Sequence, residues 1–205
     1  MLASYLTKVA IPLFVITSSF IIKTISDAGE FKTIEPHFSG DCIAVEGVVG
    51  AEDITFLKDG TALISSDDRR NKVSGLNVQG TIYRYRPNDS NDKLFNLMPK
   101  LDIGFHPHGI STYEDTDGKI YLAVVNHHSS GLFSALGGHS VEIFIYNSDS
   151  LSHVKSISHP LMISPNDIVL INKNQFYVTN DHGTSSKIKQ TLEEYLQLKR
   201  SDALF

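Results

Sequence analysis

Oxygen-bearing and imidazole side chains recur at matching points along this 205-residue sequence. Three segments align with one another, and each has a polar pair, a short apolar stretch, a tight turn, a second apolar stretch and another polar pair. Their aligned isoleucines, Ile54, Ile110 and Ile168, lie 56 and 58 residues apart. Carboxylates, amides and imidazoles bind metal ions or move protons. The repeat therefore predicts one site assembled from distant segments.

Oxygen donors precede the isoleucine in the first and third segments. They are Glu52, Asp53, Asn166 and Asp167. Three carboxylates gathered at one end of neighbouring strands would repel one another without a cation. Oxygen-only donors favour Ca²⁺, whereas Zn²⁺ prefers histidine and cysteine ligands. We therefore expect a calcium site, and the alternative is that these residues are solvated caps beside turns.

Histidines gather at the same strand ends. Five of the nine lie there: His106, His108, His127, His128 and His182. One imidazole could take a proton from water while a second raises its basicity, and a metal could polarise a carbonyl. The sequence contains no Gly-x-Ser-x-Gly motif for a serine nucleophile. The pattern therefore fits ester or lactone hydrolysis, and equally a non-catalytic binding protein.

A β-rich fold must position these residues. The Asp59-Gly60 and Asp117-Gly118 pairs are hairpin turn signals. A multi-strand repeat of this length predicts a β-propeller with one blade per repeat. Propellers close with about four to eight blades, whereas residues 43–183 supply only about two and a half. We therefore expect an all-β fold with an incomplete propeller over residues 26–183, as in a fragment or truncated product, preceded by an N-terminal hydrophobic helix.

The N-terminus carries an uncharged apolar run. Fourteen uncharged residues separate Lys8 from Lys23, which is short for a membrane span and suits a signal sequence. Residues 1–25 are therefore predicted to be a signal sequence or a signal anchor, with a buried core helix as the alternative. The protein would then be secreted or membrane-anchored.

Net charge and cysteine count argue against a nucleic-acid-binding protein and against a fold held by an internal disulfide or a cysteine zinc site. The net charge of −5 and the lack of a basic run make a nucleic-acid partner unexpected. The single cysteine, Cys42, excludes an internal disulfide and a cysteine-based structural zinc site. Asn88-Asp89-Ser90 is a glycosylation sequon on a predicted turn, which fits an exported protein.

Seven stretches resemble the serum paraoxonase/arylesterase family of calcium-dependent lactonases. They occur in family order and are Gly50–Ile54, Ala62–Ser66, Phe105–Ser111, Leu122–His127, Ser140–Phe144, Asn166–Val169 and Thr179–His182. The resemblance implies a six-bladed β-propeller with two Ca²⁺ ions in its channel, of which this chain holds about the first half. It also implies small ester or lactone substrates, and an N-terminal segment used for secretion and for attachment to a membrane or lipoprotein surface.

The resemblance implies two sets of calcium ligands. Glu52 and Asn166 match ligands of a catalytic Ca²⁺. Asp53, Asp167 and the backbone carbonyl of Ile110 match ligands of a structural Ca²⁺. The later ligands of the catalytic ion have no counterpart here, so we expect weak activity or none. A calcium-stabilised binding scaffold and a chain that folds only with a partner are the alternatives.

Other family roles fall on the histidines and on the two ends of the chain. His108 matches the proposed general base and His127 its partner, while Asp181 and His182 match a channel-side motif. Cys42 matches one half of a disulfide whose partner is absent from this sequence. Residues 184–205 have helical spacing and correspond to a lid helix, with a plain amphipathic surface helix as the alternative.

Overall fold

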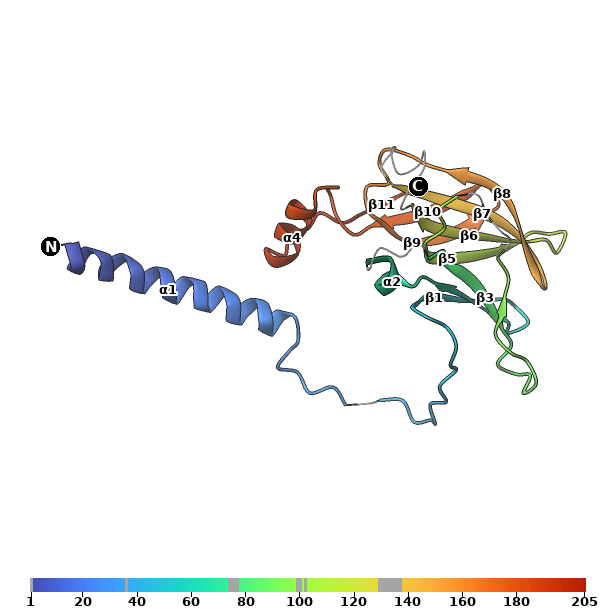
Figure 1. Cartoon of the computed structure of the whole chain (residues 1–205), viewed down its shortest axis with the longest axis horizontal. Helices are drawn as coiled ribbons and strands as arrows, with labels where there is room; N and C mark the ends of the chain where they lie inside the picture. Colours follow the sequence, from blue (N-terminus) through green and yellow to red (C-terminus); the bar gives the residue numbers. More distant parts are fainter. Residues whose placement is uncertain (1, 36, 74–77, 99–100, 102, 129–137) are drawn as a thin grey trace. The chain divides into compact units, whose positions relative to one another are not determined.

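The computed structural model describes residues 2–35, 37–73, 78–98, 101, 103–128 and 138–205 (Figure 1). The chain divides into two compact units, Met1–Ala44 and Val45–Phe205. The first unit contains helix α1, Leu2–Asp27. Its segment Lys8–Asp27 is long and apolar enough to cross a membrane, and none of that segment is buried. The sequence therefore correctly predicted an apolar helix at this end, but the helix extends beyond the fourteen uncharged residues that were judged short for a membrane span.

The second unit is built from antiparallel strands (Figure 1). Its described residues form three sheets. The first contains β1 (Ala51–Phe56), β2 (Ala62–Ser66), β3 (Thr81–Tyr85) and β4 (Phe95–Asn96). The second contains β5 (Pro107–Glu114), β6 (Ile120–His127), β7 (His139–Asn147) and β8 (Ser150–Ile157). The third contains β9 (Pro165–Asn172), β10 (Gln175–Asn180) and β11 (Asp202–Leu204), in the order β11-β10-β9.

The first two strands of each sheet repeat one hairpin. At its open end, the residue that follows the second strand or ends it donates its backbone N–H to a carbonyl four residues before the aligned isoleucine. The pairs are Asp67 to Gly50, His127 to His106 and Asp181 to Ser164, at 3.0, 3.0 and 2.9 Å. The repeat found in the sequence is therefore a structural repeat.

The second sheet is buried on both faces. On β6, Leu122 and Val124 pack toward the first sheet, whereas Ala123 and Val125 pack toward the third. All four side chains are fully buried. A strand covered on both sides reads as a continuous apolar run, because neither face needs polar residues. This explains why the second repeat has the continuous apolar run Leu122–Val125.

The outer faces of the first and third sheets are open. Ile54 on β1 is 51% exposed, whereas the equivalent Ile110 and Ile168 are 4% and 2% exposed because another sheet covers them. On the third sheet, Val169 and Ile171 are exposed. The all-β prediction is confirmed for this unit, while the described sheets form an unclosed stack rather than a complete propeller.

Among the described residues of this unit, two short helices accompany the sheets, and the C-terminal segment differs from its prediction. Helix α2 covers Arg69–Val73 and α4 covers Lys187–Tyr195. A helical segment was expected over residues 184–205, but the helix ends at Tyr195 and Asp202–Leu204 pairs with β10 as β11. The free edge of β10 accounts for this difference, since pairing satisfies its backbone groups.

Candidate active site

A β-bulge occurs at the same point of each hairpin. Between the first two strands, Glu52 is the extra residue of the first sheet, since Ala51 and Asp53 pair with the adjacent Ser66 and Ser65. The second and third sheets have equivalent shifts at His108–Gly109 and Asn166–Asp167. Bulges re-aim side chains and are common beside active sites. Because β5 packs against both β1 and β9, the three bulges lie on neighbouring strands.

Glu52 lies between an imidazole and a guanidinium. Its Oε2 atom is 2.9 Å from Nη2 of Arg69 and 3.7 Å from Nδ1 of His108. Burial lowers the pKa of His108, and the charge of Arg69 lowers it further, while Glu52, Asp181 and Asp53 oppose these effects. His108 is therefore held as a neutral imidazole, the form that accepts a proton.

Three imidazoles stand in a row along β5, β6 and β7. The ring centroids of His108 and His127 are 5.2 Å apart, and those of His127 and His139 are 4.8 Å apart. His139 pairs with His127 in the register of β6 and β7. Burial lowers the pKa of His139, with His128 and Lys187 adding to the effect. The two histidines predicted to act together are thus adjacent, and a third extends the row.

A cavity of about 420 Å³ opens beside two members of this row, His108 and His127. It is lined by Asp67, Arg69, His106, His108, His127, Ser164, Asp181, His182, Lys187 and Gln190. In its wall, Nδ1 of the buried His106 lies 2.9 Å from Oδ1 of the buried Asp67. The cavity has room for a small organic molecule and presents imidazoles, carboxylates and cations to it.

Asp53 and Asp167 approach the backbone of β5 from opposite neighbours. Asp53 Oδ2 accepts a hydrogen bond from the N–H of Ile110 at 2.8 Å. A Cβ on Gly109 would lie 2.9 Å from Asp167 Oδ1 and 2.5 Å from the carbonyl oxygen of Asn166, so only glycine permits this approach. Asp53 at the Ile110 N–H and Asp167 beside Gly109 thus bring two carboxylates to this stretch of β5, and oxygen donors of this kind fit Ca²⁺.

The predicted ligands do not gather into one cluster. Asn166 Nδ2 donates to Asp181 Oδ2 at 2.6 Å, and Glu52 contacts Arg69 and His108. In the described ranges, no three histidine, cysteine or carboxylate side chains are grouped closely enough to hold a metal ion. The predicted sets also include the Asn166 amide and the Ile110 carbonyl, which are not side chains of these types, so calcium binding stays a prediction.

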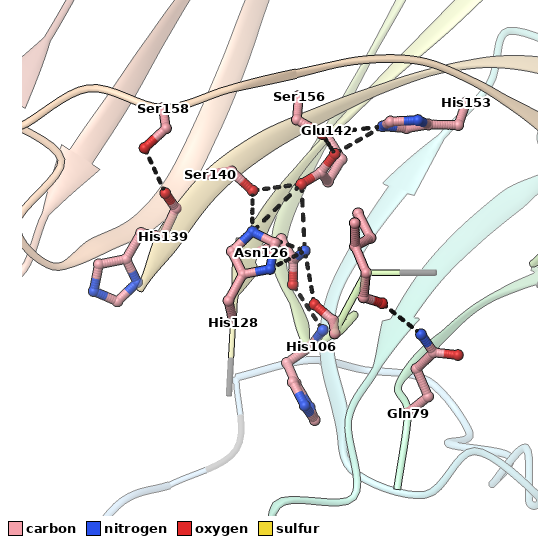
Figure 2. A network of polar contacts seen from close by, with 12 residues as sticks. Gln79, His106, Asn126, His128, His139, Ser140, Glu142, His153, Ser156 and Ser158 are labelled. Carbon is pink, nitrogen blue, oxygen red and sulfur yellow. Dashed lines mark hydrogen bonds and ion pairs between the residues drawn. The ribbon is translucent and has the colours of Figure 1, made fainter. Parts of the chain in front are cut away.

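His182 and His128 have roles outside the imidazole row. His182 lies 3.5 Å from Glu193 and 3.4 Å from Glu194, and so ties α4 to the end of β10. His128 belongs to a buried network around Glu142 (Figure 2). We therefore assign neither to proton transfer.

The Glu142 network stabilises the middle sheet. The fully buried carboxylate accepts hydrogen bonds from Ser140 and Ser156, and its Oε2 atom lies 2.7 Å from His153 Nε2 (Figure 2). Burial alone would raise the pKa of Glu142, but contacts with His128, Ser140, Ser156 and His153 lower it to about 2. An ionised carboxylate is therefore built into the fold.

Two predicted residues, Cys42 and Asn88, are not among those that line the cavity. Cys42 is an exposed free thiol in the first unit. Asn88 is exposed in a turn after β3, where a glycan could be added without disturbing the core. The structure leaves the disulfide and the glycan as predictions.

Sequence reasoning missed Arg69, His139 and the role of Gly109. Arg69 follows the Asp67-Asp68 pair, so its place just beyond an aligned polar pair was a usable signal. His139 has no counterpart in the aligned segments and emerges only from the pairing of β6 with β7. Gly109 could be assigned only once the approach of Asp167 was known.

Comparison with known proteins gives a consistent result. The arylesterase family model matches residues 30–205. The chain is 36% identical over 183 residues to serum paraoxonase/arylesterase 2 of Gallus gallus, covering 85% of this chain and 49% of the relative. It is 35% identical to serum paraoxonase/lactonase 3 of Oryctolagus cuniculus over 186 residues, with 86% and 50% covered. It is 33% identical to serum paraoxonase/arylesterase 1 of Homo sapiens over 183 residues, with 85% and 50% covered. The chain thus spans about half the length of these relatives.

Proposed function

The chain belongs to the arylesterase family, and from this we propose that it hydrolyses small aryl esters or lactones. The observation that carries the proposal is the cavity lined by His108 and His127, beside the Glu52–Arg69 pair. Relatives carry the names arylesterase, paraoxonase and lactonase. Their names and the cavity chemistry together support acyl transfer to water.

In this proposal His108 is the general base. Its lowered pKa leaves the imidazole unprotonated at neutral pH, and it lines the cavity where water and substrate would meet. His127, whose ring centroid is 5.2 Å away, would position or relay the proton. Glu52, 3.7 Å from Nδ1 of His108, would stabilise the imidazolium that forms.

Two donor sets would hold calcium. Glu52 and Asn166 would supply one, and Asp53, Asp167 and the carbonyl of Ile110 the other. A bound Ca²⁺ at the first set would polarise the ester carbonyl and stabilise the oxyanion. The close approach that Gly109 permits and the oxygen-only chemistry of the second set support a structural ion there.

We also propose the following for the whole protein. The three sheets are part of a six-bladed propeller, and their open faces are compatible with further blades. Helix α1 acts as a signal sequence or anchor for export, supported by its apolar length. Cys42 pairs with a cysteine elsewhere, and Asn88 carries a glycan.

Contact with a membrane or lipoprotein surface is the last part of the proposal. On α4 and just after it, Ile188, Leu192, Tyr195 and Leu196 are at least half exposed. Their spacing places them on one face of the helix, next to the cavity residues Lys187 and Gln190. An exposed apolar helix face of this kind binds lipid surfaces.

Hydrolysis measured with and without calcium tests the proposed function. Phenyl acetate and δ-valerolactone would be offered to the full chain in mild detergent, first with excess Ca²⁺ and then with a chelator. We expect slow turnover that the chelator abolishes. Tight calcium binding without turnover of either substrate would instead support the non-catalytic scaffold. Turnover that survives chelation would reject the calcium requirement.

A further inference from the structure

Arg69 is a cation placed directly on a carboxylate that the proposed function assigns to calcium. It begins α2, and its Nη2 atom lies 2.9 Å from Oε2 of Glu52. It lines the imidazole cavity and also an adjoining cavity of about 400 Å³ that contains Glu52 and Asp68. Arg69 therefore borders both cavities, and the second of them is also lined by Glu52.

The two partners of this ion pair differ in their exposure to solvent. The side chain of Glu52 is 15% exposed, so its charge interacts with neighbours at reduced solvent screening. The side chain of Arg69 is 50% exposed, so it can turn toward water without losing much packing. The carboxylate is thus fixed while its partner is replaceable.

We propose that Arg69 is the resident counter-cation of Glu52 and competes with divalent metal for this carboxylate. The inference rests on the proposed function, because it takes Glu52 as a metal ligand. A carboxylate oxygen held by a guanidinium is less available to Ca²⁺, and two cations at one oxygen repel each other. Metal binding at Oε2 of Glu52 therefore requires Arg69 to move away from this oxygen, which lowers the apparent affinity.

If the competition depends on charge, the calcium affinity of an Arg69 variant should depend on whether the substitution keeps the positive charge. Arg69→Gln removes the positive charge and should tighten calcium binding about tenfold. Arg69→Lys keeps the charge and should leave the affinity within about threefold of the wild-type value. Arg69→Met repeats the loss of charge with an apolar side chain and covers the case in which the glutamine variant does not fold.

Isothermal titration calorimetry with CaCl₂ alone, on the full chain in detergent, measures this directly. The gain in Arg69→Gln should disappear in the Glu52→Gln/Arg69→Gln double variant, since the contested oxygen is gone. Lys155→Gln, an exposed charge loss on β8, is the control for net charge. If the wild type binds calcium but the calcium affinity of Arg69→Gln and Arg69→Met is unchanged or weaker, the role of Arg69 is overturned while the proposed function stands. No calcium binding by any variant would reject the Glu52 metal site as well.

Discussion

His108 and His127 stand side by side at the ends of adjacent strands, with ring centroids 5.2 Å apart and ring planes tilted by 45°. A bulge makes this possible, since His108 and Gly109 together lie opposite the single residue Val125 in the register of β5 and β6. Without the extra residue, His108 would follow the regular alternation of the strand. The relation of these two imidazoles is therefore a property of the fold.

The pKa of His108 should respond in opposite directions to its two charged neighbours. Arg69 lowers this pKa and Glu52 raises it. Arg69→Gln should therefore raise the pKa and Glu52→Gln should lower it. NMR titration of the His108 ring proton at Cε1, in the presence of chelator, measures both shifts. Movement of the pKa in the same direction in the two variants would contradict this electrostatic picture.

Gly109→Ala should destabilise the second unit by at least about 2 kcal/mol, because the new Cβ meets Asn166 and Asp167 backbone atoms at 2.5 and 2.6 Å. Gly118→Ala is the comparison, since nothing lies within 4 Å of its Cβ and only its φ of 73° is unfavourable. That variant should cost about 1 kcal/mol. Urea unfolding measures both values, and equal costs would show that β9 does not press on Gly109.

Much of the fold could be predicted from local pattern, because the spacing of Ile54, Ile110 and Ile168 reports a repeated hairpin directly. The positions of the bulges could not be predicted, because the alternation of side chains in a sequence describes only regularly paired strands. They matter most for the site, as they occur at Glu52, His108 and Asn166. The sequence thus identified the polar residues without showing how they are aimed.

Long-range contacts explain the other features that the sequence did not predict. Arg69 was missed because its role depends on Glu52, which precedes it by seventeen residues. The segment Asp202–Leu204 was expected to be helical, and only the open edge of β10 explains why it is a strand. In both cases a long-range contact decides the outcome, and no local propensity reports it.

Glu142→Gln should destabilise the second unit by about 2–4 kcal/mol at neutral pH, because it removes the charge that His153, Ser140 and Ser156 stabilise. The folded pKa of about 2 lies below the ordinary value of 4.5, so the carboxylate stabilises the fold above pH 4.5. This contribution, on the order of 3 kcal/mol, is lost as the pH falls from 4.5 toward 2.

Urea unfolding at pH 7 and pH 3 separates the charge from the shape of this side chain. The difference in stability between wild type and Glu142→Gln should shrink at the lower pH. Glu46→Gln, at an exposed position, should change stability by less than about 0.5 kcal/mol. If the free energies of unfolding of wild type and Glu142→Gln differ by the same amount at both pH values, Glu142 is neutral in the folded protein.

The role of His108 as the base that activates water is tested most directly by the rate of phenyl acetate hydrolysis across pH in wild type and in His108→Gln. For wild type, the rate should fall on the acid side with a midpoint below 6.5, because the pKa of His108 is lowered. His108→Gln should reduce kcat by about 100-fold, whereas His37→Gln, at an exposed position in the first unit, should leave it unchanged. Equal rates and equal pH profiles for wild type and His108→Gln would contradict the proposed site.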